Sequence, residues 1–209
     1  MIKCDKSGID HMYGALRQYK PVRITGDHAD AAVLLPFVEN DDGELALVLT
    51  VRAMHMNSHA GEIAFPGGKV EDDDDSLIHT ALRETHEEIG LASENVKILG
   101  QLDQIMSKNG IRVQPVVAFA KQVAPLVVNP DELSHIFTVP LSYFLTEKPV
   151  IQTYEFKGFS WKMPEYVVQN HRIWGLTAMI IVNFLNIAYK MDMPHDKRPT
   201  GAHKNVIGA

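Results

Sequence analysis

The sequence lacks the features of several protein classes. It has one cysteine, Cys4, so no disulfide can form within the chain, and we expect a protein of a reducing compartment, the cytoplasm. It also lacks an excess of basic residues, because 20 lysines and arginines stand against 26 aspartates and glutamates, a formal net charge of -6. This balance argues against a surface that binds long nucleic acids or an anionic membrane.

Long hydrophobic runs are absent as well. Residues 1–7 contain neither an apolar stretch nor a small-residue cleavage pattern, so they do not resemble a signal peptide. The most hydrophobic segment, residues 173–189, is interrupted by a glycine and two asparagines and predicts a buried helix rather than a membrane span. With 209 residues, 45% hydrophobic and 22% charged, we expect one globular domain over residues 1–190, followed by a flexible tail at 191–209.

The order of hydrophobic patterns and turn signals predicts the fold class. The expected elements are an opening helix at about 9–19, a hairpin of strands at 31–38 and 45–51, a loop at 58–68, a helix at about 76–89, strands at 96–104 and 111–120, a helix start at 129–132, a hairpin around 157–158, a strand at 166–174 and the last helix. Isolated helices between strands favour an α/β fold of the α+β type, in which a mixed β-sheet is sandwiched between α-helices.

Acidic residues gather in and before the helix predicted at about 76–89. The run Glu71–Asp75 precedes it, and Glu84, Glu87 and Glu88 fall within one arc of about 100° on its surface. Arg83 lies one turn before Glu87, a spacing that predicts an ion pair. Carboxylates this close repel one another on a solvated helix, whereas their hard oxygen donors suit Mg²⁺ or Mn²⁺. The competing interpretation is an ordinary solvated helix face.

A glycine turn before this helix favours the metal site over that alternative. Pro66-Gly67-Gly68 allows the backbone to turn tightly and to approach a ligand closely, so that a carbonyl there can bind a metal and amides can face phosphate. Such turns are common, but one that leads into an acidic helix is a stronger signal. The two features together predict a cation-dependent phosphate site.

These residues resemble the signature of the Nudix hydrolases. Its consensus is Gly, five residues, Glu, seven residues, Arg-Glu, an apolar residue, any residue, Glu-Glu, any residue, Gly and an apolar residue; here Gly68 is followed by five residues, Asp74, eight residues and the stretch Arg83–Leu91. The spacer is one residue longer than in the family, Asp74 or Asp75 replaces the first glutamate, and Thr85 stands at an apolar position. The resemblance implies a Nudix-like fold.

The segment before this signature, which we call the Nudix box (Gly68–Leu91), is similar to one found in coenzyme A pyrophosphatases. That pattern has Leu-Leu-Thr-x-Arg-Ser/Ala, then a second arginine, and Phe-Pro-Gly-Gly at its end; here the matching pieces are Leu49–Ala53 and Gly61–Gly68. Asn57 stands at the position of the second arginine. With two later pieces, the resemblance covers approximately residues 30–190.

The resemblance also implies roles for individual residues. The metal-binding candidates are Glu84, Glu88, Glu87 and Gly68, with Mg²⁺ or Mn²⁺ as the cofactor. The catalytic candidates are Glu87, Glu88, Arg83 and Glu132, of which Glu87 is an additional ligand or a general base, and Glu132 is a remote ligand, a base or a structural acid at a helix start. The substrate-binding candidates are Arg52, Asn57, Gly61, Phe65, Gly67 and Gly68.

The leading functional hypothesis is hydrolysis of the pyrophosphate bond of coenzyme A or its derivatives, giving a phosphopantetheine and adenosine 3′,5′-bisphosphate. Because Asn57 departs from the subgroup pattern, another nucleoside diphosphate, such as ADP-ribose, a dinucleotide or a nucleoside triphosphate, stays open as the substrate. A non-catalytic nucleotide-binding module is the third hypothesis, and the intact acidic set argues against it. By analogy with the family we expect a homodimer, and neither nucleic acid nor membrane as a partner.

Overall fold

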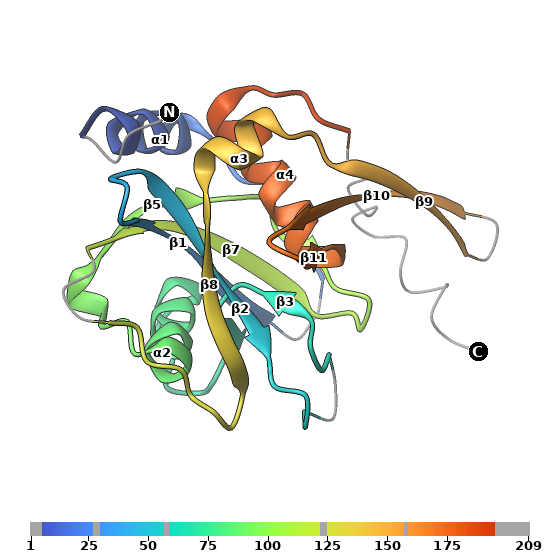
Figure 1. The fold of residues 1–209 in the computed structure, drawn as a ribbon. Helices are drawn as coiled ribbons and strands as arrows, with labels where there is room; N and C mark the ends of the chain where they lie inside the picture. Colours follow the sequence, from blue (N-terminus) through green and yellow to red (C-terminus); the bar gives the residue numbers. More distant parts are fainter. Residues whose placement is uncertain (1–5, 27–29, 57–58, 122–124, 157–158, 195–209) are drawn as a thin grey trace.

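The computed structural model describes residues 6–26, 30–56, 59–121, 125–156 and 159–194, which form helices and two β-sheets (Figure 1). In chain order the elements are α1 (Lys6–Gln18), β1 (Asp30–Glu39), β2 (Leu45–Arg52), β3 (Ile63–Ala64), β4 (Gly67–Lys69), α2 (Leu77–Ile89), the 3₁₀ turn η1 (Ser93–Asn95), β5 (Val96–Gln101), β6 (Ile105–Met106), β7 (Arg112–Ala120), β8 (Leu133–Pro140), α3 (Leu141–Thr146), β9 (Val150–Phe156), β10 (Phe159–Val168), β11 (His171–Ile173) and α4 (Gly175–Tyr189).

The larger sheet is mixed, with strand order β3-β2-β1-β7-β5 and with β4, β6 and β8 pairing to β1, β7 and β2. Among the strands of the described residues, β1 and β7 run parallel and the other pairs of this sheet are antiparallel. β1 pairs with β2 near its end, where Phe37 lies opposite Leu47, and with β4 near its start, where Ala32 lies opposite Gly68. The glycine turn is therefore held against the first strand of the sheet.

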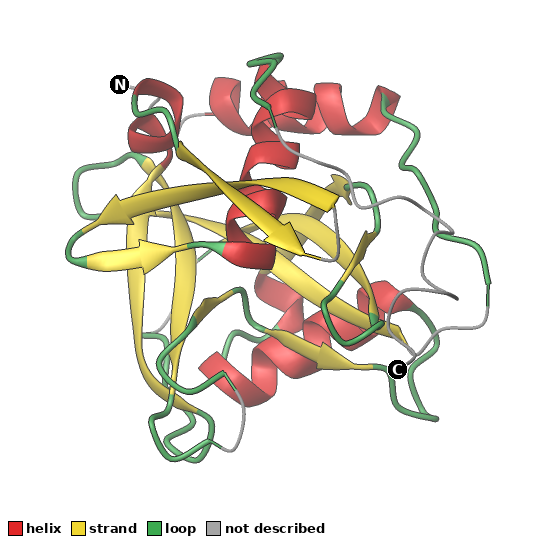
Figure 2. Ribbon diagram, turned by 90° about the vertical axis from the view of Figure 1, so that its right-hand side faces the viewer, coloured by secondary structure: helices red, strands yellow, loops and turns green. Residues whose placement is uncertain are grey.

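Helices cover both faces of this sheet (Figures 1 and 2). Because side chains of a strand alternate between faces, Leu34 packs in the cluster that contains Ala81 of α2, whereas Leu35 packs in the cluster that contains α4. On the α4 side, the rings of Phe37 and Phe184 lie 5.1 Å apart. The predicted α+β class, with a mixed sheet between helices, is confirmed.

Local signals set the bounds of α2. The Ser76 hydroxyl accepts a hydrogen bond from the backbone N–H of His79 at 3.1 Å, which caps the first turn. Gly90 ends the helix in the left-handed region, with φ of 68°. The helix that we expected at about 76–89 is thus present. None of the described helices is long and apolar enough to cross a membrane.

The smaller sheet, β9-β10-β11, is antiparallel and packs beside β8 and α3. The Tyr143 hydroxyl donates to the Val167 carbonyl at 2.8 Å, and the Gln169 side chain donates to the Thr138 carbonyl at 3.3 Å. The expected hairpin is present as β9 and β10, and its turn residues 157–158 lie outside the described residues.

Three expectations about local structure are wrong. Residues 129–132 form a turn that leads into β8 instead of a helix, because the following residues pair with β2. The expected strand at 166–174 is divided into β10 and β11 by Gln169 and Asn170, whose φ values of 52° and 64° make a tight turn. The expected loop at 58–68 contains the short strands β3 and β4, which the sheet pairing stabilises.

The start of the predicted tail is packed against the domain. The Met193 backbone N–H donates to the Asn186 side chain at 2.7 Å, and Met193 is buried in the hydrophobic core. Residues 195–209 lie outside the described residues.

Candidate active site

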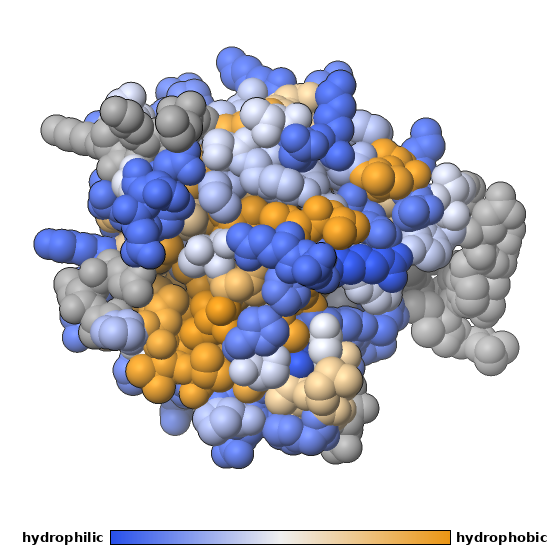
Figure 3. Space-filling view, in the orientation of Figure 1, coloured by the Kyte–Doolittle hydropathy of each residue, from blue (hydrophilic) through white to orange (hydrophobic). Residues whose placement is uncertain are grey.

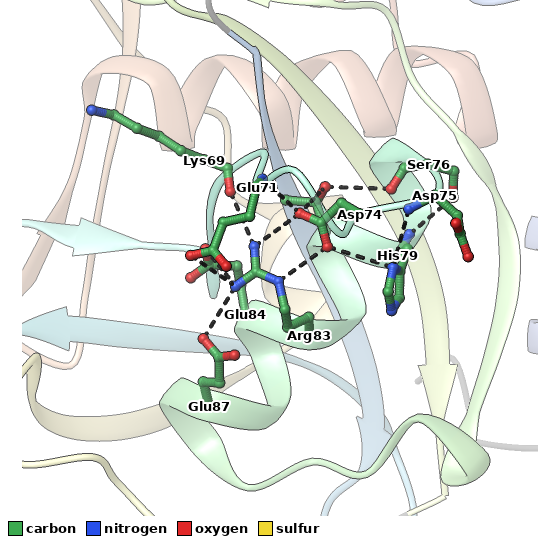
Figure 4. Close-up of polar contacts among 10 residues, drawn as sticks. Lys69, Glu71, Asp74, Asp75, Ser76, His79, Arg83, Glu84 and Glu87 are labelled. Atoms are coloured by element: carbon green, nitrogen blue, oxygen red, sulfur yellow. Dashed lines mark hydrogen bonds and ion pairs between the residues drawn. The ribbon is translucent and has the colours of Figure 1, made fainter.

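Asp74 and Arg83 form the ion pair that organises the loop before α2 (Figure 4). The Asp74 oxygens accept hydrogen bonds from Nε and Nη2 of Arg83 at 3.0 and 2.9 Å, a bidentate arrangement. The carboxylate also accepts bonds from the Thr80 hydroxyl and the Glu71 backbone N–H. These donors, Arg83 first, hold the pKa of Asp74 well below its ordinary value, although burial opposes them. Asp74, and not the exposed Asp75, thus pairs with the arginine of the box.

Arg83 connects the loop to the acidic face of α2. Its Nη1 donates to Glu84 at 3.1 Å and to Glu87 at 3.2 Å, and its Nη2 donates to the Lys69 carbonyl (Figure 4). The predicted pair with Glu87 is present, but the Glu87 side chain is 51% exposed and lies at the solvent-facing side of the candidate site. The bonds to Asp74 raise the pKa of Arg83, so its charge persists at any working pH. Its geometry is that of a positioning residue that fixes carboxylates.

Glu88 lies on the same helix but points into the protein. Its side chain accepts a hydrogen bond from the Gly67 backbone N–H at 3.0 Å, and the residue is only 3% exposed. Burial raises the pKa of Glu88 to about 8. The negative charges of Glu132 and Glu84 act in the same direction, whereas the Gly67 hydrogen bond and the positive charge of Arg52 lower it. A buried carboxyl of this kind is suited to exchange its proton for a cation.

Glu84 lies against the glycine turn. A side chain at position 68 would place its Cβ on the Glu84 carboxylate, so only glycine leaves this space open. Burial raises the pKa of Glu84, Arg83 opposes this rise, and the charges of Glu87 and Glu132 add to it. The missing Cβ of Gly68 therefore gives this carboxylate room against the backbone.

Two residues reach this centre from the sheet. Arg52 ends β2 and Glu132 immediately precedes β8, and the backbone N–H of Ala53 donates to the Glu132 carbonyl at 2.8 Å. The effects of both charges on Glu88 show that they lie near it. Within the described residues, Arg52 Nε is buried and has no hydrogen-bond partner. Strand pairing thus brings the Arg52 guanidinium and the Glu132 carboxylate toward α2.

Three other predicted substrate-binding residues have different surroundings. Phe65 is 4% exposed and packs in the hydrophobic core, so it anchors the turn instead of offering a surface to substrate. Gly61, with φ of 70°, donates its N–H to the Arg52 carbonyl at 3.1 Å and closes the loop after β2. Asn57 lies outside the described residues.

Sequence reasoning missed Thr80 and the link between Glu132 and Ala53. Thr80 is fully buried and donates to both Asp74 and the Ser76 carbonyl, so it completes the surroundings of Asp74. A threonine in the first turn of a helix that follows an aspartate was a weak signal for this contact. The Glu132 link depends on pairing between distant strands and had no local signal.

The donor set fits a hard divalent cation. Glu84 and Glu88 supply carboxylate oxygens next to the Gly68 backbone, and Mg²⁺ typically binds few protein ligands and completes its shell with water and phosphate. In the part of the chain that the structure describes, no group of three or more His, Cys, Asp or Glu side chains is already gathered around one metal position. Glu84 and Glu87 are bonded to Arg83 instead.

Comparisons with known proteins show which family this chain resembles. Residues 28–174 match the family model described as NUDIX domain. The chain is 39% identical over 166 residues to "Uncharacterized Nudix hydrolase NudL" of Photorhabdus laumondii, which covers 77% of this chain and 86% of that protein. It is 33% identical over 184 residues to "Nudix hydrolase 15, mitochondrial" of Arabidopsis thaliana, which covers 83% of this chain and 61% of that protein. A MutT/nudix family protein from Enterococcus faecalis shares the fold, with a TM-score of 0.52 at 17% identity over 89% of this chain and 70% of that one.

Proposed function

The chain belongs to the Nudix hydrolase family of pyrophosphohydrolases, and from this premise we propose that it hydrolyses coenzyme A or a coenzyme A derivative to a phosphopantetheine and adenosine 3′,5′-bisphosphate. Members of the family act on nucleoside diphosphates with the help of divalent cations. The proposal concerns the substrate, the choice of Mg²⁺ or Mn²⁺, and the roles of the residues.

The observation that carries the proposal is the position of the segment before the box. Leu49–Ala53 and Gly61–Gly68, which resemble the coenzyme A pyrophosphatase pattern, are joined by the pairing of β2 with β3, and Gly67 and Gly68 lie against Glu88 and Glu84 of the acidic helix. Arg52 from this segment lies near Glu88 and has a buried Nε without a hydrogen-bond partner among the described residues. A guanidinium with a free donor is suited to bind a phosphate oxygen of the substrate.

An apolar surface beside the carboxylates also supports a substrate with a partly hydrophobic arm. Figure 3 shows hydrophobic side chains gathered on the face where α2 and β8 lie. The partly exposed hydrophobic residues of this region are Leu126, Val127, Val128 and Ile136. The segment that contains Leu126, Val127 and Val128 is bonded to the end of α2, because the Val127 N–H donates to the Ile89 carbonyl at 3.0 Å. The pantetheine arm of coenzyme A can cover such a surface.

In the proposed reaction, water attacks phosphorus and the bond between the two phosphates breaks. Glu84, Glu88 and the Gly68 carbonyl would hold the cations, and Glu87 would be an additional ligand or the general base. The chemistry that cations would supply there is to screen the pyrophosphate charge, polarise its P–O bonds and lower the pKa of water. Glu132 takes a proton from water or binds a cation, and Arg52 orients the phosphate. Asp74 acts through Arg83, whose bonds position Glu84 and Glu87.

A second substrate class has its own support. Asn57 replaces the second arginine of the coenzyme A pyrophosphatase pattern, so one phosphate-binding cation of that subgroup is missing from the sequence. This difference favours a nucleoside diphosphate with fewer phosphates than coenzyme A, such as ADP-ribose. The same catalytic residues serve that reaction.

A substrate panel distinguishes these candidates. The purified protein is incubated with Mg²⁺ or Mn²⁺ and coenzyme A, ADP-ribose, a diadenosine polyphosphate or a nucleoside triphosphate, and products are separated by chromatography. We expect adenosine 3′,5′-bisphosphate from coenzyme A at the highest kcat/KM, and a loss of orders of magnitude for Glu88→Gln. Faster cleavage of ADP-ribose would replace the coenzyme A proposal. Binding of a nucleotide without cleavage of any substrate would favour the non-catalytic module. The cytoplasmic location and the homodimer stay predictions.

A further inference from the structure

An aromatic cluster lies where β8 of the larger sheet meets β11 of the smaller one. His135 and Phe137 belong to β8, and His171 belongs to β11. The rings of Phe137 and His171 stack, with centroids 4.2 Å apart and planes 25° apart, and the His135 ring lies 5.3 Å from His171. His135 is exposed and the other two are half-buried. The cluster therefore presents ring surface to solvent.

β8 leads directly from the catalytic residues to this cluster. His135 follows Glu132 by three residues, about 10 Å along an extended strand. It lies opposite Val51, the neighbour of Arg52 on β2, so its side chain is on the face of the sheet that α4 covers, whereas Arg52 is on the face that α2 covers. A nucleoside separates its base from its phosphate by a single sugar. A base whose phosphate is held near Arg52 and Glu132 therefore reaches His135 around the outer edge of β8.

The outer edge of β8 supplies hydrogen-bonding groups at the same place. In the described part of the chain β8 pairs with β2 alone, and the Thr138 carbonyl accepts its bond from Gln169 instead. Backbone groups alternate in direction along an antiparallel strand, so Ile136 also directs its N–H and C=O to the outer edge. One donor beside one acceptor matches the ring nitrogen and the amino group on the edge of adenine.

Two other exposed aromatic residues, Trp174 at the start of α4 and Tyr154 in the smaller sheet, are less suited to this role. The Arg172 guanidinium lies 5.1 Å from the Trp174 ring centroid and is bonded to Glu165 at 2.7 Å, so one face of that ring is covered. Tyr154 is on β9, which β10 separates from β11. Proximity to Glu132 therefore favours His135.

We propose that His135, supported by Phe137 and His171, stacks on the adenine base of the substrate. This inference rests on the proposed function, because it requires a substrate whose diphosphate is joined to adenosine. Loss of an aromatic ring that stacks on a base weakens nucleotide binding by between about fivefold and about a hundredfold. The backbone edge at Ile136 adds a preference for adenine over guanine, since guanine presents its donor and acceptor in the reverse order.

Calorimetric titration with AMP and GMP tests the inference without turnover. We expect the wild-type protein to bind AMP more tightly than GMP, and His135→Ala to weaken AMP binding by at least about fivefold. The matched control is Tyr154→Ala, which removes an exposed ring from the smaller sheet and leaves AMP binding unchanged. Phe137→Leu keeps apolar volume, removes the stacked ring, and is expected to weaken AMP binding too. In steady-state assays with the adenine-containing substrate, His135→Ala raises KM and leaves kcat within about twofold.

The outcomes separate this inference from the proposed substrate. Equal AMP affinity in wild type, His135→Ala and Phe137→Leu overturns the inference, and so does a loss confined to Tyr154→Ala. If His135→Ala weakens AMP binding while coenzyme A is not cleaved, the adenine site stands and the coenzyme A proposal fails. If the wild-type protein and His135→Ala cleave coenzyme A with the same KM, the proposed function stands and the adenine site fails. Thermal unfolding curves check that each variant is folded.

Discussion

The backbone N–H of Gly67 donates a hydrogen bond of 3.0 Å to the carboxylate of Glu88, 21 residues later in the chain. This contact joins the glycine turn to the acidic helix and fixes the side chain at the centre of the site. The bond favours the charged carboxylate, but burial outweighs it and raises the pKa to about 8. Without a cation, Glu88 is therefore mostly protonated at neutral pH.

Glu88→Gln tests that protonation state in the metal-free protein. The pKa of Glu88 is raised from 4.5 to about 8 in the folded protein, so the folded state binds more protons than the unfolded state between these values. Stability from this group is complete below pH 4.5 and is lost as the pH rises through 8. We expect the variant to gain on the order of a few kcal/mol relative to wild type between pH 5 and pH 9. Urea unfolding in excess chelator measures this difference, and parallel pH profiles would contradict it.

Metal binding has the opposite dependence on pH. A cation binds the ionised carboxylate, so affinity for Mg²⁺ should rise by up to about tenfold per pH unit below the pKa of Glu88. The rise in Tm caused by Mg²⁺ is therefore expected to be larger at pH 9 than at pH 6, and activity is expected to increase toward alkaline pH. Differential scanning fluorimetry at fixed Mg²⁺ measures the first effect. Equal shifts at both pH values would remove Glu88 from the metal site.

Asp74 and Asp75 form a natural comparison. Asp74→Asn removes one partner of the bidentate pair with Arg83 and is expected to destabilise the protein by about 1–3 kcal/mol, less than in a fully buried pair because Arg83 is partly exposed. Since the pKa of Asp74 is lowered, its contribution is present above the unfolded pKa and is lost as the pH falls through the folded value.

The control for this change is Asp75→Asn, at an exposed position, with an expected effect within about 0.5 kcal/mol. Chemical denaturation at pH 7 compares the two variants. Equal stabilities would show that the aspartates are interchangeable and that the pair with Arg83 contributes nothing.

Gly67→Ala and Gly68→Ala should fail for different reasons. At position 67, where φ is 148°, a Cβ would strike the carbonyl of Ala32, so we expect a loss of at least about 2 kcal/mol of stability. At position 68 the atoms nearest to a Cβ belong to the Glu84 carboxylate, which can move, so we expect the protein to fold and kcat/KM to fall by more than about tenfold.

Gly110→Ala serves as the control for backbone strain, because Gly110 has φ of 76° and, among the described residues, no heavy atom lies within 4 Å of the place that a Cβ would take. It should lose some stability and keep its activity. Full activity in Gly68→Ala would separate the glycine turn from the role of Glu84.

The sequence was sufficient where short-range rules apply. Ser76 and Gly90 are local capping residues, so the bounds of α2 were predictable, and helical spacing placed Glu84 and Glu88 on one side. The pair between Arg83 and Glu87 follows from the same geometry. These features depend on residues within a few positions of each other, which explains why the acidic face of α2 was predictable from the sequence.

Long-range pairing decided the rest. The turn at 129–132 was mistaken for a helix start because its composition suits both, and the antiparallel pairing of β8 with β2 selects the turn. That pairing brings Glu132 to the site.

The sequence by itself thus determined the family signature, the acidic helix and its glycine turn, since each is encoded by neighbouring residues. Only the tertiary structure decided that Asp74 rather than Asp75 holds Arg83, that Glu88 is buried against Gly67, and that Phe65 belongs to the core. The physical reason is that burial and strand register, which set these contacts and the pKa of Glu88, arise only when distant segments pack together.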